Sequence, residues 1–138
     1  MPPLARLAID LAARLVRRNP ERYLSHMLAS APPADRVVLA DPGYRTLFVD
    51  SMAAALHQGG RGAAWELCLL ARPWDFRLKE VRMPIRIWQG LADNIVPPAV
   101  AQHLVAMLPQ SDANYLADEG HVSLGIRHID AVLADLRT

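Results

Sequence analysis

The sequence predicts an α/β protein in which a helical segment precedes a strand–helix–strand–helix unit. Up to about residue 71, apolar residues recur at helical spacing, and the breaks between these patterns fall at proline or glycine. After that point, two short strand-like runs alternate with two helical patterns. The 138 residues allow one domain with a modest core. We therefore expect two segments, residues 1–71 and 72–138, packed as one unit.

Helices in the first segment are predicted from apolar periodicity and from their boundary residues. Asn19-Pro20-Glu21 is a start signal, and Asp41-Pro42 is a second one. Asp35 is expected to cap a short helix. Gly59-Gly60 is expected to end the helix that starts at Pro42. The expected helices cover residues 2–18, 20–30, a few residues after 35, 42–58 and 63–70.

The second segment begins with a loop from Arg72 to Met83. Pro84 then precedes an apolar run, and proline is tolerated at the start of a strand. The expected elements are a strand at 85–89, a helix at 98–108, a strand at 113–116 and a helix at 124–136. Two strands joined by a helix are expected to pair in parallel through a right-handed crossover.

Composition and charge exclude several classes of protein. The chain is 52% hydrophobic and 21% charged with a formal net charge of +1, which is typical of a globular protein and gives no indication of nucleic-acid binding. A single cysteine, Cys68, excludes a disulfide framework and favours a cytoplasmic location. No run of about 18 apolar residues predicts a membrane span. The arginine-rich stretch from Pro2 to Arg18 is also compatible with a transit peptide or a membrane-surface helix, but a helix packed on its own protein is the simpler interpretation.

Asp93 and His121 are the candidate catalytic residues. Each follows a predicted strand, so both are expected on loops at the carboxyl ends of neighbouring strands. An aspartate there can fix the tautomer of a histidine that acts as a general base. Taken singly, Asp93 fits a loop or cap residue, and His121 fits a surface or cap residue. The other histidines, which fall in predicted helices and lack metal-ligand spacing, are His26, His57, His103 and His128.

The sequence around both residues resembles the α/β-hydrolase family. The run Met83-Pro84-Ile85-Arg86-Ile87-Trp88-Gln89-Gly90-Leu91-Ala92-Asp93-Asn94-Ile95-Val96-Pro97 is similar to the strand that leads to the catalytic acid in that family. Ala117-Asp118-Glu119-Gly120-His121-Val122-Ser123-Leu124 resembles the loop of its catalytic histidine. The order of acid before base also matches the family triad. Residues 1–71 resemble the helical lid of such enzymes in character only.

By this resemblance the chain is the C-terminal part of a serine-type α/β hydrolase for an ester, lactone or related small apolar acyl substrate. Asp93 would orient His121, and neither a cofactor nor a metal is implied. The family's G-x-S-x-G nucleophile elbow is absent from the sequence, and so is the oxyanion loop that precedes it. Ser123 comes nearest to the motif but is better explained as a helix-capping residue. We therefore expect no hydrolysis by these residues alone. The resemblance leaves the substrate open, and also whether the nucleophile is serine or aspartate.

A parallel sheet of two strands is not stable by itself, and an exposed apolar edge invites pairing with another chain. The sequence therefore predicts self-association through a strand edge. The alternative function is that of a truncated, non-catalytic homologue that dimerises or binds a ligand. An in-frame G-x-S-x-G upstream of Met1 in the DNA would favour a fragment of an enzyme, and a ribosome-binding site there would favour a short protein.

Overall fold

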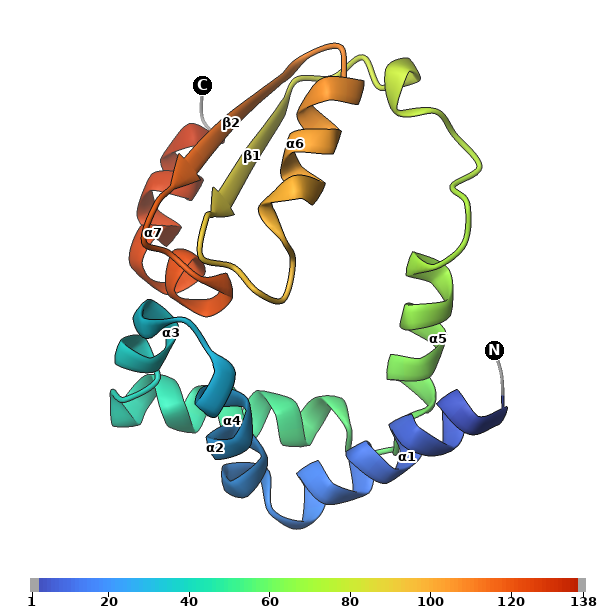
Figure 1. The fold of residues 1–138 in the computed structure, drawn as a ribbon, viewed down its shortest axis with the longest axis vertical. Coiled ribbons are helices and arrows are strands. Elements are labelled where there is room, and N and C mark those ends of the chain that lie inside the picture. Colours follow the sequence, from blue (N-terminus) through green and yellow to red (C-terminus); the bar gives the residue numbers. More distant parts are fainter. Residues whose placement is uncertain (1–2, 137–138) are drawn as a thin grey trace. The chain divides into compact units, whose positions relative to one another are not determined.

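The computed structural model describes residues 3–136 and divides the chain into two compact units (Figure 1). The first unit contains the residues up to Ser30 together with Asp41–Trp74. The second contains Ala31–Ala40 and the residues from Asp75 onward. Residues 1, 2, 137 and 138, at the outer ends of the two predicted segments, lie outside the described residues.

The first unit is built of four helices. They are α1 (Pro3–Arg18), α2 (Pro20–Ser30), α4 (Pro42–Ala55) and α5 (Arg61–Leu70). Helix α1 packs against the other three, and α2 also packs against α4. Small and branched apolar side chains fill the spaces between them: Ala13, Val16, Leu24, Val49 and Ala64.

The second unit contains a two-stranded parallel sheet with helices packed against it (Figure 1). Its elements are α3 (Pro33–Val38), a 3₁₀ turn (Leu78–Glu80), β1 (Ile85–Gly90), α6 (Pro98–Met107), β2 (Ser111–Leu116) and α7 (His121–Asp135). The register runs from Ile85 opposite Ser111 to Gly90 opposite Leu116. Both α6 and α7 contact β1, and α3 contacts α7. The carboxyl ends of both strands therefore lie at the same edge of the sheet.

The predicted class is confirmed in its coarse form, because residues 3–136 form seven α-helices and a small parallel sheet. The main differences lie at element boundaries. Helix α4 ends at Ala55, three residues before the predicted Gln58, and Gly59 beyond it adopts a φ of 94°. This left-handed conformation suits glycine and prevents the helix from continuing. His57 consequently lies in the turn after the helix.

Two further predictions were wrong at the level of single residues. Asp35 does not cap α3, because that helix begins at Pro33 and Asp35 lies inside it. Helix α7 begins at His121 and not at Leu124, so the histidine is the first residue of a helix and not part of a loop. The two residues are connected in the structure, because the carboxylate of Asp35 accepts hydrogen bonds at the start of α7.

Within residues 3–136, none of the helices is both long enough and apolar enough to cross a membrane.

Candidate functional site

Asp93 lies in the tight turn that follows β1. One carboxylate oxygen, Oδ1, accepts hydrogen bonds from the backbone N–H groups of Ile95 (2.8 Å) and Val96 (2.9 Å). These two bonds hold the carboxylate within its own loop, as in an Asx turn. The side chain is only 7% exposed. The second oxygen, Oδ2, is directed at His121.

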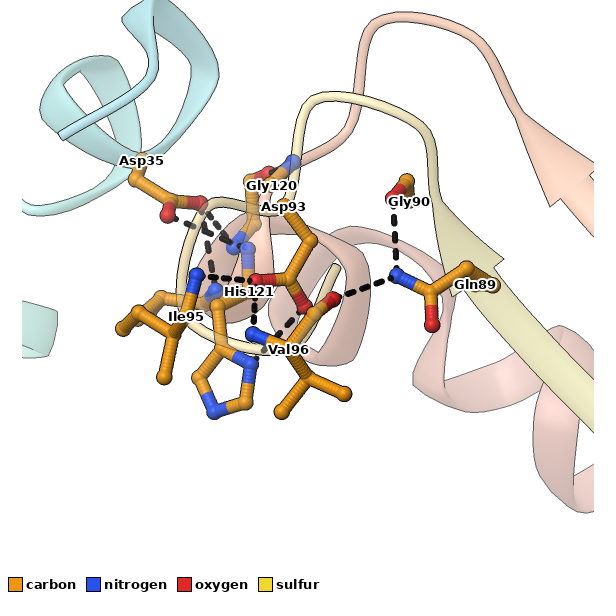
Figure 2. A network of polar contacts seen from close by, with 10 residues as sticks. Asp35, Gln89, Gly90, Asp93, Ile95, Val96, Gly120 and His121 are labelled. Carbon is orange, nitrogen blue, oxygen red and sulfur yellow. Dashed lines mark hydrogen bonds and ion pairs between the residues drawn. The ribbon is translucent and has the colours of Figure 1, made fainter. Parts of the chain in front are cut away.

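His121 meets this second oxygen through its ring. The distance from Nδ1 to Asp93 Oδ2 is 2.9 Å, and 43% of the imidazole side chain remains exposed. Because an ionised carboxylate can only accept, the neutral ring must carry its proton on Nδ1. The structure therefore brings the two predicted residues together and leaves the second ring nitrogen, Nε2, pointing away from Asp93 (Figure 2).

The Asp93 carboxyl is held in its ionised form. Burial is the largest single influence and by itself would raise its pKa. The hydrogen bonds from Val96, His121 and Ile95, together with the positive charge of a protonated His121, outweigh burial and lower the pKa of Asp93 below its usual value. An ionised Asp93 is the form that can orient an imidazole and stabilise an imidazolium.

The loop that carries Asp93 and the loop that precedes His121 are joined through their backbones. Leu91 N–H donates to Leu116 C=O at 2.9 Å, and Ala92 N–H donates to Glu119 C=O at 3.0 Å. A Cβ atom at Gly90 would overlap the carbonyl group of Glu119. The sequence Gln89-Gly90-Leu91 therefore needs its glycine so that the loops can approach this closely.

Glu119 ties the loop that precedes His121 to helix α7. Its carboxylate lies 3.3 Å from Nη1 of Arg127 and 3.2 Å from Nε2 of His128, both on α7. Burial would raise its pKa and is the largest single influence, but Ser123, His128 and Arg127 together lower the pKa of Glu119. Glu119, together with His128 and Arg127, therefore connects this loop to α7.

Asp35 is the site residue that the sequence did not reveal. Its side chain is buried, and its carboxylate accepts from the N–H groups of His121 (3.1 Å), Val122 (3.1 Å) and Ser123 (2.8 Å), as drawn in part in Figure 2. These are N–H groups of the first turn of α7, which have no partner within the helix. The partners are 86 to 88 positions apart in the chain, so no local pattern could indicate the contact.

Ser123 has a capping function, close to the one predicted. Its hydroxyl accepts the Gly120 N–H at 2.8 Å, three residues before it, and its side chain is fully buried. The bond satisfies the amide that precedes the helix. The buried hydroxyl of Ser123 therefore caps the start of α7.

In the described part of the chain, no group of three or more His, Cys, Asp or Glu side chains is placed to bind a metal ion.

Comparisons with protein-family models, with curated proteins and with solved structures found no match to this chain.

Proposed function

We propose that this chain is the C-terminal part of an α/β hydrolase, in which His121 is the general base and Asp93 orients it. The single observation that carries the proposal is the 2.9 Å bond between Nδ1 of His121 and a buried, ionised Asp93 at the carboxyl edge of a parallel sheet. A nucleophile outside these 138 residues, a serine by resemblance, would give its proton to Nε2 of His121 as it attacks an acyl carbon.

The surroundings of the pair favour an apolar acyl substrate. Leu91, Ile95 and Val96 flank Asp93 in sequence, and all three side chains are exposed. Ile95 and Val96 also lie beside the imidazole in Figure 2. Exposed apolar side chains next to a few oriented polar groups are typical of small-molecule sites. An ester or lactone with a short hydrocarbon chain fits these surroundings.

The first test measures the tautomer of His121. Ring ¹⁵N shifts at about pH 9, where a free imidazole is neutral, distinguish a proton on Nδ1 from one on Nε2. The wild type is expected to carry it on Nδ1. In Asp93→Asn, the amide oxygen keeps the bonds to Ile95 and Val96, so the amide NH₂ faces the ring and the proton moves to Nε2. A wild-type proton on Nε2 would refute the orienting role of Asp93.

The second test measures turnover of p-nitrophenyl butyrate. The chain alone is expected to give no turnover above that of His121→Ala. Addition of a polypeptide that carries a G-x-S-x-G elbow, encoded directly upstream, should produce turnover that His121→Ala abolishes. Asp93→Asn should lower kcat by about 10³- to 10⁴-fold, the effect of a wrong tautomer in a serine triad. Turnover in the mixture that is unchanged in His121→Ala would contradict the proposal.

A second candidate function, self-association, is favoured by the sheet itself. Among the described residues, β1 pairs only with β2. Ile85 and Leu91 N–H groups point toward the β2 side, so by alternation the backbone groups of Arg86 and Trp88 point to the opposite edge. An edge of this kind can pair with the same edge of a second copy.

Arg86→Pro tests this candidate. The substitution removes an N–H group on the outer edge without removing one that faces β2, so it should abolish a dimer seen by analytical ultracentrifugation. Arg86→Ala is the matched control, because it also loses the ion pairs of Arg86 with Asp112 and Asp135 but keeps the N–H group. A wild type that stays monomeric across a concentration series would eliminate this function.

A further inference from the structure

The Asp35 carboxylate is the most deeply buried charge of the site. The residue is 2% exposed, and the partners found for it are three backbone N–H groups at the start of α7. Hydrogen bonds to a carboxylate are about twice as strong as neutral ones, and the positive end of a helix dipole favours a negative charge. The three hydrogen bonds and the helix dipole therefore offset the free-energy cost of burying the Asp35 carboxylate, without a cationic side chain.

The two oxygens of Asp35 have different partners. Oδ1 accepts from Val122 and Ser123, whereas Oδ2 accepts from His121. One oxygen thus secures the helix, and the other holds the backbone of the residue that carries the imidazole. The ring and the backbone of His121 are each bonded to an aspartate: Asp93 at Nδ1 and Asp35 at the amide nitrogen.

Gly120 shows how closely Asp35 fits against this turn. A Cβ atom on Gly120 would lie 2.5 to 2.6 Å from the carboxyl atoms of Asp35. The Gly120 φ of −97° is open to any residue, so the need for glycine is steric and not conformational. The Glu119-Gly120-His121 turn is therefore shaped around the carboxylate of a distant helix.

We propose that Asp35 is a positioning residue for the His121 base, and that it holds the backbone of His121 where the imidazole can donate to Asp93. This inference rests on the proposed function, since it assigns Asp35 a role in the same site. The carboxylate also places a negative charge beside the N-terminus of α7, whose dipole would otherwise oppose an imidazolium at His121. Asp35 would act through His121 and would not touch the substrate.

Asp35→Asn is the sharpest variant. It preserves volume, and its single oxygen can still accept from Val122 and Ser123, the pair that shares Oδ1. Its NH₂ group then faces the His121 N–H group. Because both groups are donors, the hydrogen bond to His121 is the one that is lost. Asp41→Asn is the matched control, because Asp41 caps α4 of the first unit through Gly43 and Tyr44.

The experiment records the ring ¹⁵N shifts of His121 and the amide exchange of Ser123 in the full chain. We expect Asp35→Asn to keep Ser123 protected but to shift the His121 ring nitrogens from values for a proton on Nδ1 toward those of free histidine. Asp41→Asn should leave both unchanged. A purely structural role for Asp35 predicts lower stability with unaltered ring shifts, so that result would overturn the proposal.

Two further outcomes separate this inference from the proposed function. If the wild-type ring already carries its proton on Nε2, then the Asp93–His121 pair itself is wrong. If the wild type has the proton on Nδ1 and Asp35→Asn has the same shifts, only the role of Asp35 is wrong. Should Asp35→Asn fail to fold, Asp35→Glu replaces it, since a longer carboxylate displaces the turn and should shift the same ring signals.

Discussion

The starts of α4 and α7 are both capped by an aspartate, but in opposite ways. Asp41 caps the helix that it precedes, with bonds to Gly43 (2.8 Å) and Tyr44 (3.2 Å) at an exposed surface. Asp35 caps a helix that begins 86 residues later, from a buried position. A local cap mainly sets where a helix begins, whereas a distant cap also joins two parts of a fold.

The difference also explains why the two caps carry different weight for function. The first turn of α4 carries none of the proposed catalytic side chains, while the first residue of α7 is His121. A helix that begins at its catalytic residue leaves that side chain dependent on whatever fixes the first turn. The two caps should therefore respond differently to substitution.

Removal of the distant cap should have the largest effect. Asp35→Ala leaves three N–H groups at the start of α7 without their acceptor, and we expect it to lower the free energy of unfolding of the second unit by about 3 kcal/mol or more. Asp41→Ala should lower that of the first unit by about 1 kcal/mol, the usual effect of a lost N-cap. Amide hydrogen exchange in α7 and α4 reports each unit separately. Equal losses would refute the comparison.

Alanine in place of glycine beside each cap should also give unequal results. Gly120→Ala would place its Cβ 2.5 Å from Asp35 Oδ1, so a buried carboxylate must move, and we expect a loss of about 2 kcal/mol. Gly43→Ala would place its Cβ 3.1 Å from Asp41 Oδ1 at the surface. There the better helix propensity of alanine should offset the tight contact, leaving stability within about 0.5 kcal/mol. Urea denaturation checks both, and a neutral Gly120→Ala would show that the turn can relax.

The pH dependence should reveal the ionised partner of His121. The pKa of Asp93 is lower in the folded protein than in the unfolded chain, where it is about 3.9. Its contribution to stability is therefore complete above that value and is lost as the pH falls through the lower, folded pKa. We expect the stability difference between wild type and Asp93→Asn in urea titrations to shrink steadily below about pH 4. A difference that stays constant down to pH 2 would contradict an ionised Asp93.

The smallest effect is expected at an exposed ion pair beside the local cap. Arg45 of α4 lies 2.6 Å from Glu21 of α2, and the side chain of Glu21 is 52% exposed. Glu21→Ala should lower stability by about 0.5 kcal/mol, and less at high salt, because solvent and ions screen such pairs. A loss comparable to that of Asp35→Ala would mean that exposed long-range contacts matter as much as buried ones. Thermal unfolding at low and at high salt measures the effect.

Most elements could be predicted because their signals are local. Asn19 caps α2 through the Arg22 N–H, as the motif predicts, and the apolar run from Ile85 forms a strand. The boundary of α7 could not be predicted, because nothing within a few residues of His121 indicates an acceptor for its N–H group. The same limit applies to Asp35, whose sequence context suggests only a cap for its own helix.

Within the site, local patterns in the sequence place an acid and a histidine after two strands, since strand periodicity and loop residues are encoded in neighbouring positions. Long-range contacts bring the two side chains to 2.9 Å, start α7 at the histidine and hold its backbone through Asp35. The physical reason is that an N–H group at a helix start needs an acceptor. Only the folded chain shows that this N–H group stands at a helix start and which distant carboxylate satisfies it.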